Sequence, residues 1–270
     1  MGQQSFTLKT PSLSDFSVEY YSHIGNNTLN AKVYPPHVDD ALEIYVLLEG
    51  DASFMVDDNL YKLKSGDAVI TRPNQMHNCI LNSNSVHSHL CFWFKPNCEF
   101  VFNKLLNPLN TNHVTPSDEN KERLTALYTD IIKSSEDKDD LKTLYLMLEM
   151  IDLFGKEIGA TEHQSTMSPL LKNIVDDITE NLIDINSLSY FTKKYSISSS
   201  TLNRLFKDNF NTSPKLYIET KRLSLARVLL KRGESVMSAC MKSGFPDYSN
   251  FIRLFRRRFG LTPNQYKKKK

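Results

Sequence analysis

Two histidines and two carboxylates have side chains that could do chemistry in this 270-residue chain. His37, Asp39 and Glu43 are close in sequence, and His77 follows in the same region. Imidazole nitrogens and carboxylate oxygens bind divalent metal ions, so the four could in principle form a metal site. The alternative is that His37 and His77 are barrel or rim residues retained from an ancestor, and both are candidate effector-binding residues. We favour this alternative and predict no metal.

Three further residues form a candidate pocket. His89 and Trp93 differ by an even number of positions, so on a strand both would face the same side. Trp93 offers a flat face for a sugar, although it could equally be a core residue. With Tyr45 they complete the predicted effector site of His37, Tyr45, His77, His89 and Trp93, and a sugar is the candidate effector.

Several functional classes find no support. No catalytic triad, phosphate-binding loop or zinc-finger spacing occurs, so we predict no catalytic residues, no enzyme activity and no cofactor. Cys79, Cys91, Cys98 and Cys240 lack C-x-x-C spacing and are interpreted as reduced thiols, with a redox sensor as the alternative. Without an apolar run of bilayer length or a signal-peptide pattern, we expect a cytoplasmic protein that makes no membrane contact.

The charge distribution points to a polyanionic partner. Residues 168–270 hold 20 Lys and Arg residues against 8 Asp and Glu residues, whereas residues 1–167 hold 13 against 23. A basic domain joined to an acidic one is typical of nucleic-acid binding. A solvated basic face is the simpler alternative, and the run Lys267–Lys270 could be only that.

The pattern of apolar residues predicts two kinds of structure before residue 158. Between residues 31 and 96, short apolar segments alternate with turn residues, which is typical of a sandwich or small barrel. Between residues 120 and 159 the period is helical. The second helix, at 141–154, is apolar on several sides, so it could pack on the barrel, on a second copy of the chain, or on both.

These patterns predict two domains. The polar segment 158–167 is interpreted as a linker between an effector-binding and dimerisation domain at 1–157 and an all-helical domain at 168–270. Ser168-Pro169, Ser213-Pro214 and Thr262-Pro263 each combine an N-cap residue with a proline at the first helical position.

An internal repeat decides the nature of the second domain. Leu205-Phe206-x3-Phe210-x3-Pro214-x2-Tyr217 recurs 49 residues later as Leu254-Phe255-x3-Phe259-x3-Pro263-x2-Tyr266. Each copy combines an apolar helix, a tight turn, a second helix and a new helix start, which predicts a duplicated helix-turn-helix. A helical bundle with a charged surface is the alternative. The residues predicted to project toward DNA are Ser199, Ser200, Asn203, Arg204, Lys207, Tyr248, Ser249, Asn250, Arg253 and Arg257.

Residues 168–270 resemble the DNA-binding domain of the AraC/XylS family of transcription regulators. The matching residues are Ile197-Ser198, Arg204-Leu205-Phe206, Leu225-Ala226-Arg227, Ser243-Gly244-Phe245, Tyr248-Ser249-Asn250-Phe251 and Phe255-x3-Phe259-Gly260-x-Thr262-Pro263-x2-Tyr266. The resemblance implies that the helix from Pro214 places two recognition helices in successive major grooves, about 34 Å apart.

By this resemblance, base contacts fall to Ser200, Asn203 and Arg204 in the first copy and to Tyr248, Ser249, Ile252 and Arg253 in the second. Three residues depart from the family pattern. Ser196 stands where the first turn often has glycine, Pro246 replaces the usual N-cap serine, and Ile252 is apolar at a usually polar position. The start of the second recognition helix is therefore uncertain, and Ile252 is a candidate contact to a thymine methyl group.

Residues 31–96 resemble the cupin-type barrel that carries the effector site in many members of this family. The segment from His37 to Gly50 is similar to the first cupin metal motif, except that Asp39 replaces a histidine. Effector domains of the family generally bind organic molecules without metal, which favours an organic effector. His89 resembles in its placement a sugar-contacting histidine of arabinose-type members.

We therefore predict a two-domain regulator with an N-terminal cupin-like (jelly-roll) β-barrel, an α-helical dimerisation hairpin and a C-terminal double helix-turn-helix. It is expected to be a homodimeric activator that binds double-stranded promoter DNA and a small molecule, with RNA polymerase as a partner implied by the resemblance. A cupin metalloenzyme with an added DNA-binding domain and a ligand-independent dimeric regulator are the alternatives.

Overall fold

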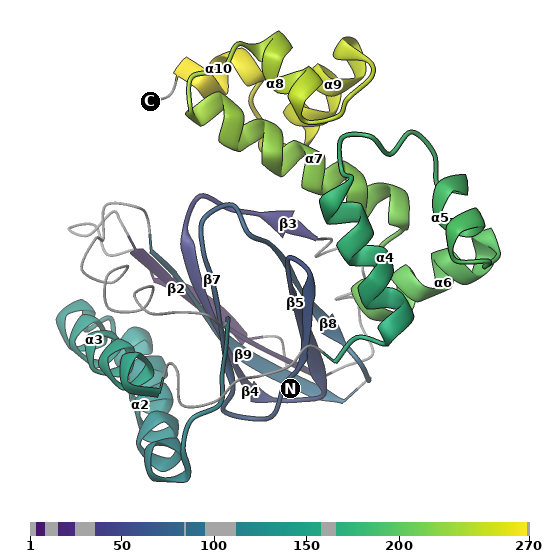
Figure 1. Ribbon diagram of the computed structural model, residues 1–270. Coiled ribbons are helices and arrows are strands. Elements are labelled where there is room, and N and C mark those ends of the chain that lie inside the picture. Colours follow the sequence, from purple (N-terminus) through teal and green to yellow (C-terminus); the bar gives the residue numbers. More distant parts are fainter. Residues whose placement is uncertain are drawn as a thin grey trace. The chain divides into compact units, whose positions relative to one another are not determined.

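The computed structural model describes the backbone of residues 4–8, 16–24, 36–83, 85–94, 112–157 and 166–268 (Figure 1). The chain divides into two compact units, and the second comprises residues 167–268 with the short segments 36–38 and 74–78. The first unit is dominated by antiparallel sheets and the second by helices. This arrangement confirms the predicted two-domain fold class. Most of the predicted linker, residues 158–165, and Cys98 lie outside the described residues.

In the described residues, ten strands form two sheets. The six-stranded sheet has the order β1 (Gln4–Leu8), β2 (Phe16–Ile24), β9 (Val86–Phe94), β4 (Leu42–Glu49), β7 (Ala68–Thr71), β10 (His113–Val114). The four-stranded sheet has the order β3 (His37–Val38), β8 (Met76–Leu81), β5 (Ala52–Val56), β6 (Asn59–Lys62). The strands described here thus make a pair of sheets rather than one closed barrel. The sequence pattern did not predict β8.

The paired strands β4 and β9 divide the sheet domain into two cores. Successive side chains of a strand point to opposite faces. Leu42, Ile44 and Val46 face the same side as Leu90 and Phe92, where they pack against the two helices. The residues between them, such as Tyr45 and Cys91, pack against β5 and β6 of the other sheet. One pair of strands therefore contributes to both cores.

The two helices of the sheet domain are α2 (Asp118–Glu136) and α3 (Asp140–Glu157). Met147, Met150 and Phe154 of α3 are buried in the core that α2 and the six-stranded sheet share. Leu141 and Tyr145 lie on another side of α3 and are 78% and 65% exposed. The predicted apolar stripe is thus divided between a buried side and an exposed one.

Residues 167–268, the larger part of the second unit, contain only helices and the turns between them. The helices are α4 (Pro169–Glu180), α5 (Ser189–Lys194), α6 (Ser199–Phe210), α7 (Pro214–Lys231), α8 (Val236–Lys242), α9 (Tyr248–Phe259) and α10 (Pro263–Lys268). Ser168 and Ser213 cap α4 and α7, since their side chains accept hydrogen bonds from Leu171 N and Leu216 N. The long helix α7 joins α4–α6 to α8–α10 (Figure 1). No helix in the described part of the chain is long and apolar enough to cross a membrane.

The repeat is visible in the backbone. Asn211 and Gly260 end α6 and α9 with left-handed φ values of 54° and 71°. Ser196 and Gly244 occupy the turns before α6 and α9, with φ values of 51° and 84°. Glycine adopts this conformation without the steric penalty that other residues experience. The same backbone turn is therefore built once with glycine and once with serine.

We expect opposite effects from exchanging the side chains of these two turns. Ser196 is exposed, so Ser196→Gly should relieve the left-handed strain and raise the stability by up to about 1 kcal/mol. A Cβ at Gly244 would lie 2.8 Å from Ile183 Cα, so Gly244→Ala should destabilise the helical unit by about 2 kcal/mol or more. Thermal unfolding followed by circular dichroism would measure both. A change of the same sign in the two variants would contradict this interpretation of the turns.

Candidate DNA-reading helices and ligand site

Each recognition helix is fixed to its unit by buried aromatic residues of the repeat. In the first helix-turn-helix unit, α5 and α6, the rings of Phe206 and Phe210 lie 5.2 and 5.3 Å from that of Tyr217. In the second unit, α8 and α9, Phe255 lies 4.6 Å from Phe259 and 5.7 Å from Tyr266. The spacing that the two copies share thus supplies matching aromatic cores beneath α6 and α9.

The starts of both recognition helices are well defined. Ser198 caps α6 by accepting a hydrogen bond of 3.0 Å from Thr201 N. Asp247 caps α9 by accepting from Asn250 N. The expectation that Pro246 leaves the start of α9 uncertain is therefore wrong, because the cap lies one residue later. The Asp247 carboxylate satisfies a backbone N–H of the first helical turn and places a negative charge at the helix N-terminus.

Most of the residues predicted to project toward DNA are exposed. These are Ser199, Ser200, Asn203, Arg204, Lys207, Tyr248, Ser249, Arg253 and Arg257. Two of the arginines are held by neighbours, since Arg253 donates to Asn250 Oδ1 at 2.6 Å and Arg257 to Glu219 Oε1 at 3.1 Å. Asn250 is half-buried. Ile252 is also half-buried and packs against the core of the second unit, so only part of its side chain faces outward.

Of the residues predicted to bind an effector, Tyr45, His89 and Trp93 lie on the face of the six-stranded sheet that packs against the other sheet. The rings of Tyr45 and His89 are stacked with centroids 4.9 Å apart. The Tyr45 hydroxyl lies 3.1 Å from His87 Nε2 and 3.4 Å from Cys79 Sγ. Burial raises the pKa of Tyr45 above its ordinary value and that of Cys79 to about 12, so both stay protonated near neutral pH.

Tyr45, Cys79, His87 and His89 form a polar interior between the sheets. Of these, His87 and Cys79 were not among the predicted effector ligands. His87 shares its strand face with His89, and their rings lie 5.0 Å apart. Their even spacing in sequence already indicated a common face. Cys79 lies on β8, the strand that the sequence pattern missed, so no signal placed it near Tyr45.

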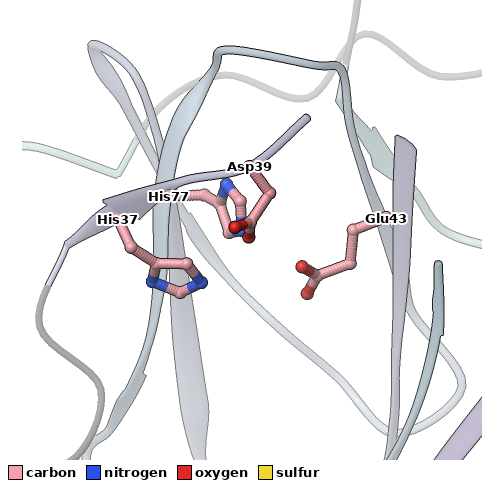
Figure 2. A group of neighbouring side chains, drawn as sticks. All are labelled: His37, Asp39, Glu43 and His77. Atoms are coloured by element: carbon pink, nitrogen blue, oxygen red, sulfur yellow. The ribbon is translucent and has the colours of Figure 1, made fainter. Parts of the chain in front are cut away.

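The other two predicted effector residues, His37 and His77, belong to a separate group with Asp39 and Glu43 (Figure 2). His37 and His77 are partners in the register of β3 and β8, and their rings are 4.3 Å apart. One ligand atom from each of the four residues lies within 4.8 Å of those of the others. Glu43 links this group to the polar interior, because its Oε2 accepts a hydrogen bond of 3.0 Å from Trp93 Nε1.

Comparisons with known proteins match both parts of the chain. A model described as an AraC-like ligand binding domain matches residues 24–178, and a helix-turn-helix domain model matches residues 191–269. The first match alone covers more than half of the chain.

The similarity to known proteins extends over most of the chain. The virulence regulon transcriptional activator VirF from Yersinia enterocolitica is 23% identical, covering 85% of this chain and 89% of VirF. The transcriptional activator RhaS from Citrobacter koseri is 24% identical, covering 87% and 88%. The solved structure of ToxT from Vibrio cholerae is 12% identical with a TM-score of 0.37, covering 94% and 97%. With a ligand-binding domain and a helix-turn-helix domain both matched, this chain belongs to the AraC family of DNA-binding transcription regulators.

Proposed function

We propose that the chain is a homodimeric transcriptional activator whose α6 and α9 bind two adjacent major grooves under the control of a small molecule. The main support is that α6 and α9 present equivalent exposed polar faces on equivalent aromatic cores. The names of VirF and RhaS as activators support the direction of regulation and, with it, RNA polymerase as a partner.

The length of α7 supports simultaneous contact with two grooves. Its 18 residues span ~27 Å at the rise of an α-helix. In the sequence, α7 separates the first helix-turn-helix unit from the second. Successive major grooves on one face of DNA are about 34 Å apart. The length of α7 is thus of the same order as one helical turn of DNA. The excess of basic residues in 168–270 favours the phosphate contacts that such binding requires.

Substitutions in α6 should separate base contacts from phosphate contacts. Arg204→Ala should weaken binding to the preferred site by about 1–3 kcal/mol and relax specificity, because it removes a base-edge contact. Lys207→Ala should weaken binding to all sequences alike. It should also reduce the slope of the logarithm of the binding constant against the logarithm of salt concentration by about one. Selection of sites from a random duplex pool, followed by salt titration, would measure both effects. An unchanged site preference in Arg204→Ala would remove Arg204 from the reading residues.

We propose that the exposed side of α3 forms the dimer interface. Leu141, Tyr145 and Leu148 lie on this side and are 78%, 65% and 36% exposed. Residues three and four positions apart form one continuous helix surface, so the three side chains make a single apolar strip. A symmetric contact would bury two copies of this strip against each other.

A charge placed in this strip should separate the dimer. Tyr145→Glu is expected to raise the dimer dissociation constant at least tenfold, because it would bury a carboxylate in the interface. Ala126→Glu, which adds the same charge at an exposed position of α2, serves as the control. Sedimentation equilibrium would compare the two proteins, and dimers of equal strength in both would exclude α3 as the interface.

We propose that the effector binds between the sheets beside Tyr45, His89 and Trp93, and that it is a sugar. Apolar surroundings with a few convergent polar groups are typical of ligand pockets. His89 and Trp93 are only half-buried, which leaves them partly accessible.

Trp93 is the single tryptophan of the chain, so its fluorescence reports on this site. A monosaccharide effector should change the emission of Trp93 and raise the melting temperature. Trp93→Phe is the control for any signal from elsewhere. A panel of monosaccharides that changes neither quantity would exclude sugars as the effector class.

A further inference from the structure

The group His37, Asp39, Glu43 and His77 is built from three strands or their immediate ends. His37 lies on β3, Asp39 follows it, Glu43 lies on β4 and His77 on β8. Figure 2 shows the Glu43 carboxylate directed from its strand toward the other three side chains.

Two of the four side chains are fixed in orientations that suit a cation. His77 Nδ1 lies 3.0 Å from the backbone oxygen of Gln75. A carbonyl oxygen can only accept, so Nδ1 carries the proton and Nε2 of the neutral ring keeps its lone pair. Metal-binding histidines are usually oriented by such a hydrogen bond. Glu43 is oriented in the same way by the indole N–H of Trp93 at 3.0 Å.

The burial of this group also favours a cation. His77 is 1% exposed and Glu43 is 5% exposed, and the Asp39 carboxylate lies within the same 4.8 Å span. Two carboxylates brought together in a poorly solvated place repel each other, and a positive charge between them removes this cost. A divalent ion would supply that charge at the centre of the group.

The spacing fits one ion. Bonds from nitrogen and oxygen ligands to zinc are about 2.0–2.2 Å, so two ligands on opposite sides of an ion are at most about 4.4 Å apart. The observed limit of 4.8 Å requires only small side-chain rotations to reach this value. Two imidazoles with two carboxylates form a donor set that suits first-row transition metals better than Mg²⁺ or Ca²⁺, which prefer oxygen ligands alone.

We propose that His37, Asp39, Glu43 and His77 bind one divalent first-row transition metal ion. This revises our sequence-based prediction of no metal. The proposal goes beyond the regulatory function and does not depend on it, because occupancy can be measured without DNA or effector.

The first experiment uses the full-length chain without a histidine tag, stripped of metal by a chelator. Zn²⁺, Co²⁺ and Mg²⁺ are added separately, and bound metal is measured after gel filtration together with the melting temperature. We expect about one equivalent of Zn²⁺ or Co²⁺ per chain and a rise of several degrees in the melting temperature. We also expect Co²⁺ to quench Trp93, which contacts Glu43. Mg²⁺ should produce none of these changes.

The second experiment compares adjacent carboxylates. Asp39→Asn and His37→Gln should each lower the affinity for Zn²⁺ at least tenfold, whereas Asp40→Asn should leave it unchanged. Asp40 is exposed and stands next to Asp39 but outside the group, so the two asparagine variants are matched. Circular dichroism without metal would establish that each variant is folded. If Asp39→Asn does not fold, His37→Gln provides the same test. His37 is only half-buried, so this variant should keep the fold.

Three results would overturn the proposal. The first is a metal-free wild-type chain that binds neither Zn²⁺ nor Co²⁺ in stoichiometric amounts. The second is an equal response of the Asp39→Asn and Asp40→Asn proteins to Zn²⁺. The third is equal stabilisation by Mg²⁺, which would assign the group to a different class of cation. Because none of these measurements involves DNA, their outcome is separate from that of the proposed regulatory function.

Discussion

The alternation of side chains along the paired strands β4 and β9 is the constraint on which the sheet domain depends. One face, which carries Ile44 and Phe92, is apolar and holds α2 and α3 in place. The other face carries Glu43, Tyr45 and His89, so polar groups enter the space between the sheets. A shift of one residue in this pairing would exchange the two faces and place the polar groups beneath the helices. The same register therefore fixes the attachment of the proposed dimer helix and the composition of the proposed ligand sites.

In the helical unit the corresponding constraint is a packing unit that occurs twice. The Phe-x3-Phe-x3-Pro-x2-Tyr spacing places two rings of a recognition helix against a tyrosine of the helix that follows. The left-handed residues Asn211 and Gly260 then end both recognition helices at equivalent positions. Since the buried residues repeat, the exposed residues between them have equivalent orientations while their identities differ. The two proposed reading surfaces therefore share one geometry, while their exposed side chains differ.

The sequence predicted features that have a local cause and missed those that depend on distant pairing. The strand at 42–48 and the helix from Pro214 were expected correctly, because alternation and the Ser-Pro start are visible in a short segment. Strand β8, Met76–Leu81, was missed because buried His77 and Asn78 interrupt its apolar pattern. The cap at Asp247 was missed because Pro246 occupies the position where a cap was expected. The assembly of His37 with His77 depends on a register between strands that no local pattern specifies.

Glu43 gives these separate observations a common physical consequence. Its carboxylate accepts from Trp93, which belongs to the proposed effector site, and it also faces His37, Asp39 and His77. A molecule that stacked on Trp93 would change the hydrogen bond to Glu43, and an ion bound by Glu43 would change the position of the indole. Coupling between two ligands is reciprocal, so if both bind, each must alter the affinity for the other by the same factor. A single carboxylate on β4 would then connect metal occupancy to effector recognition, without requiring any movement of the strands that hold the domain together.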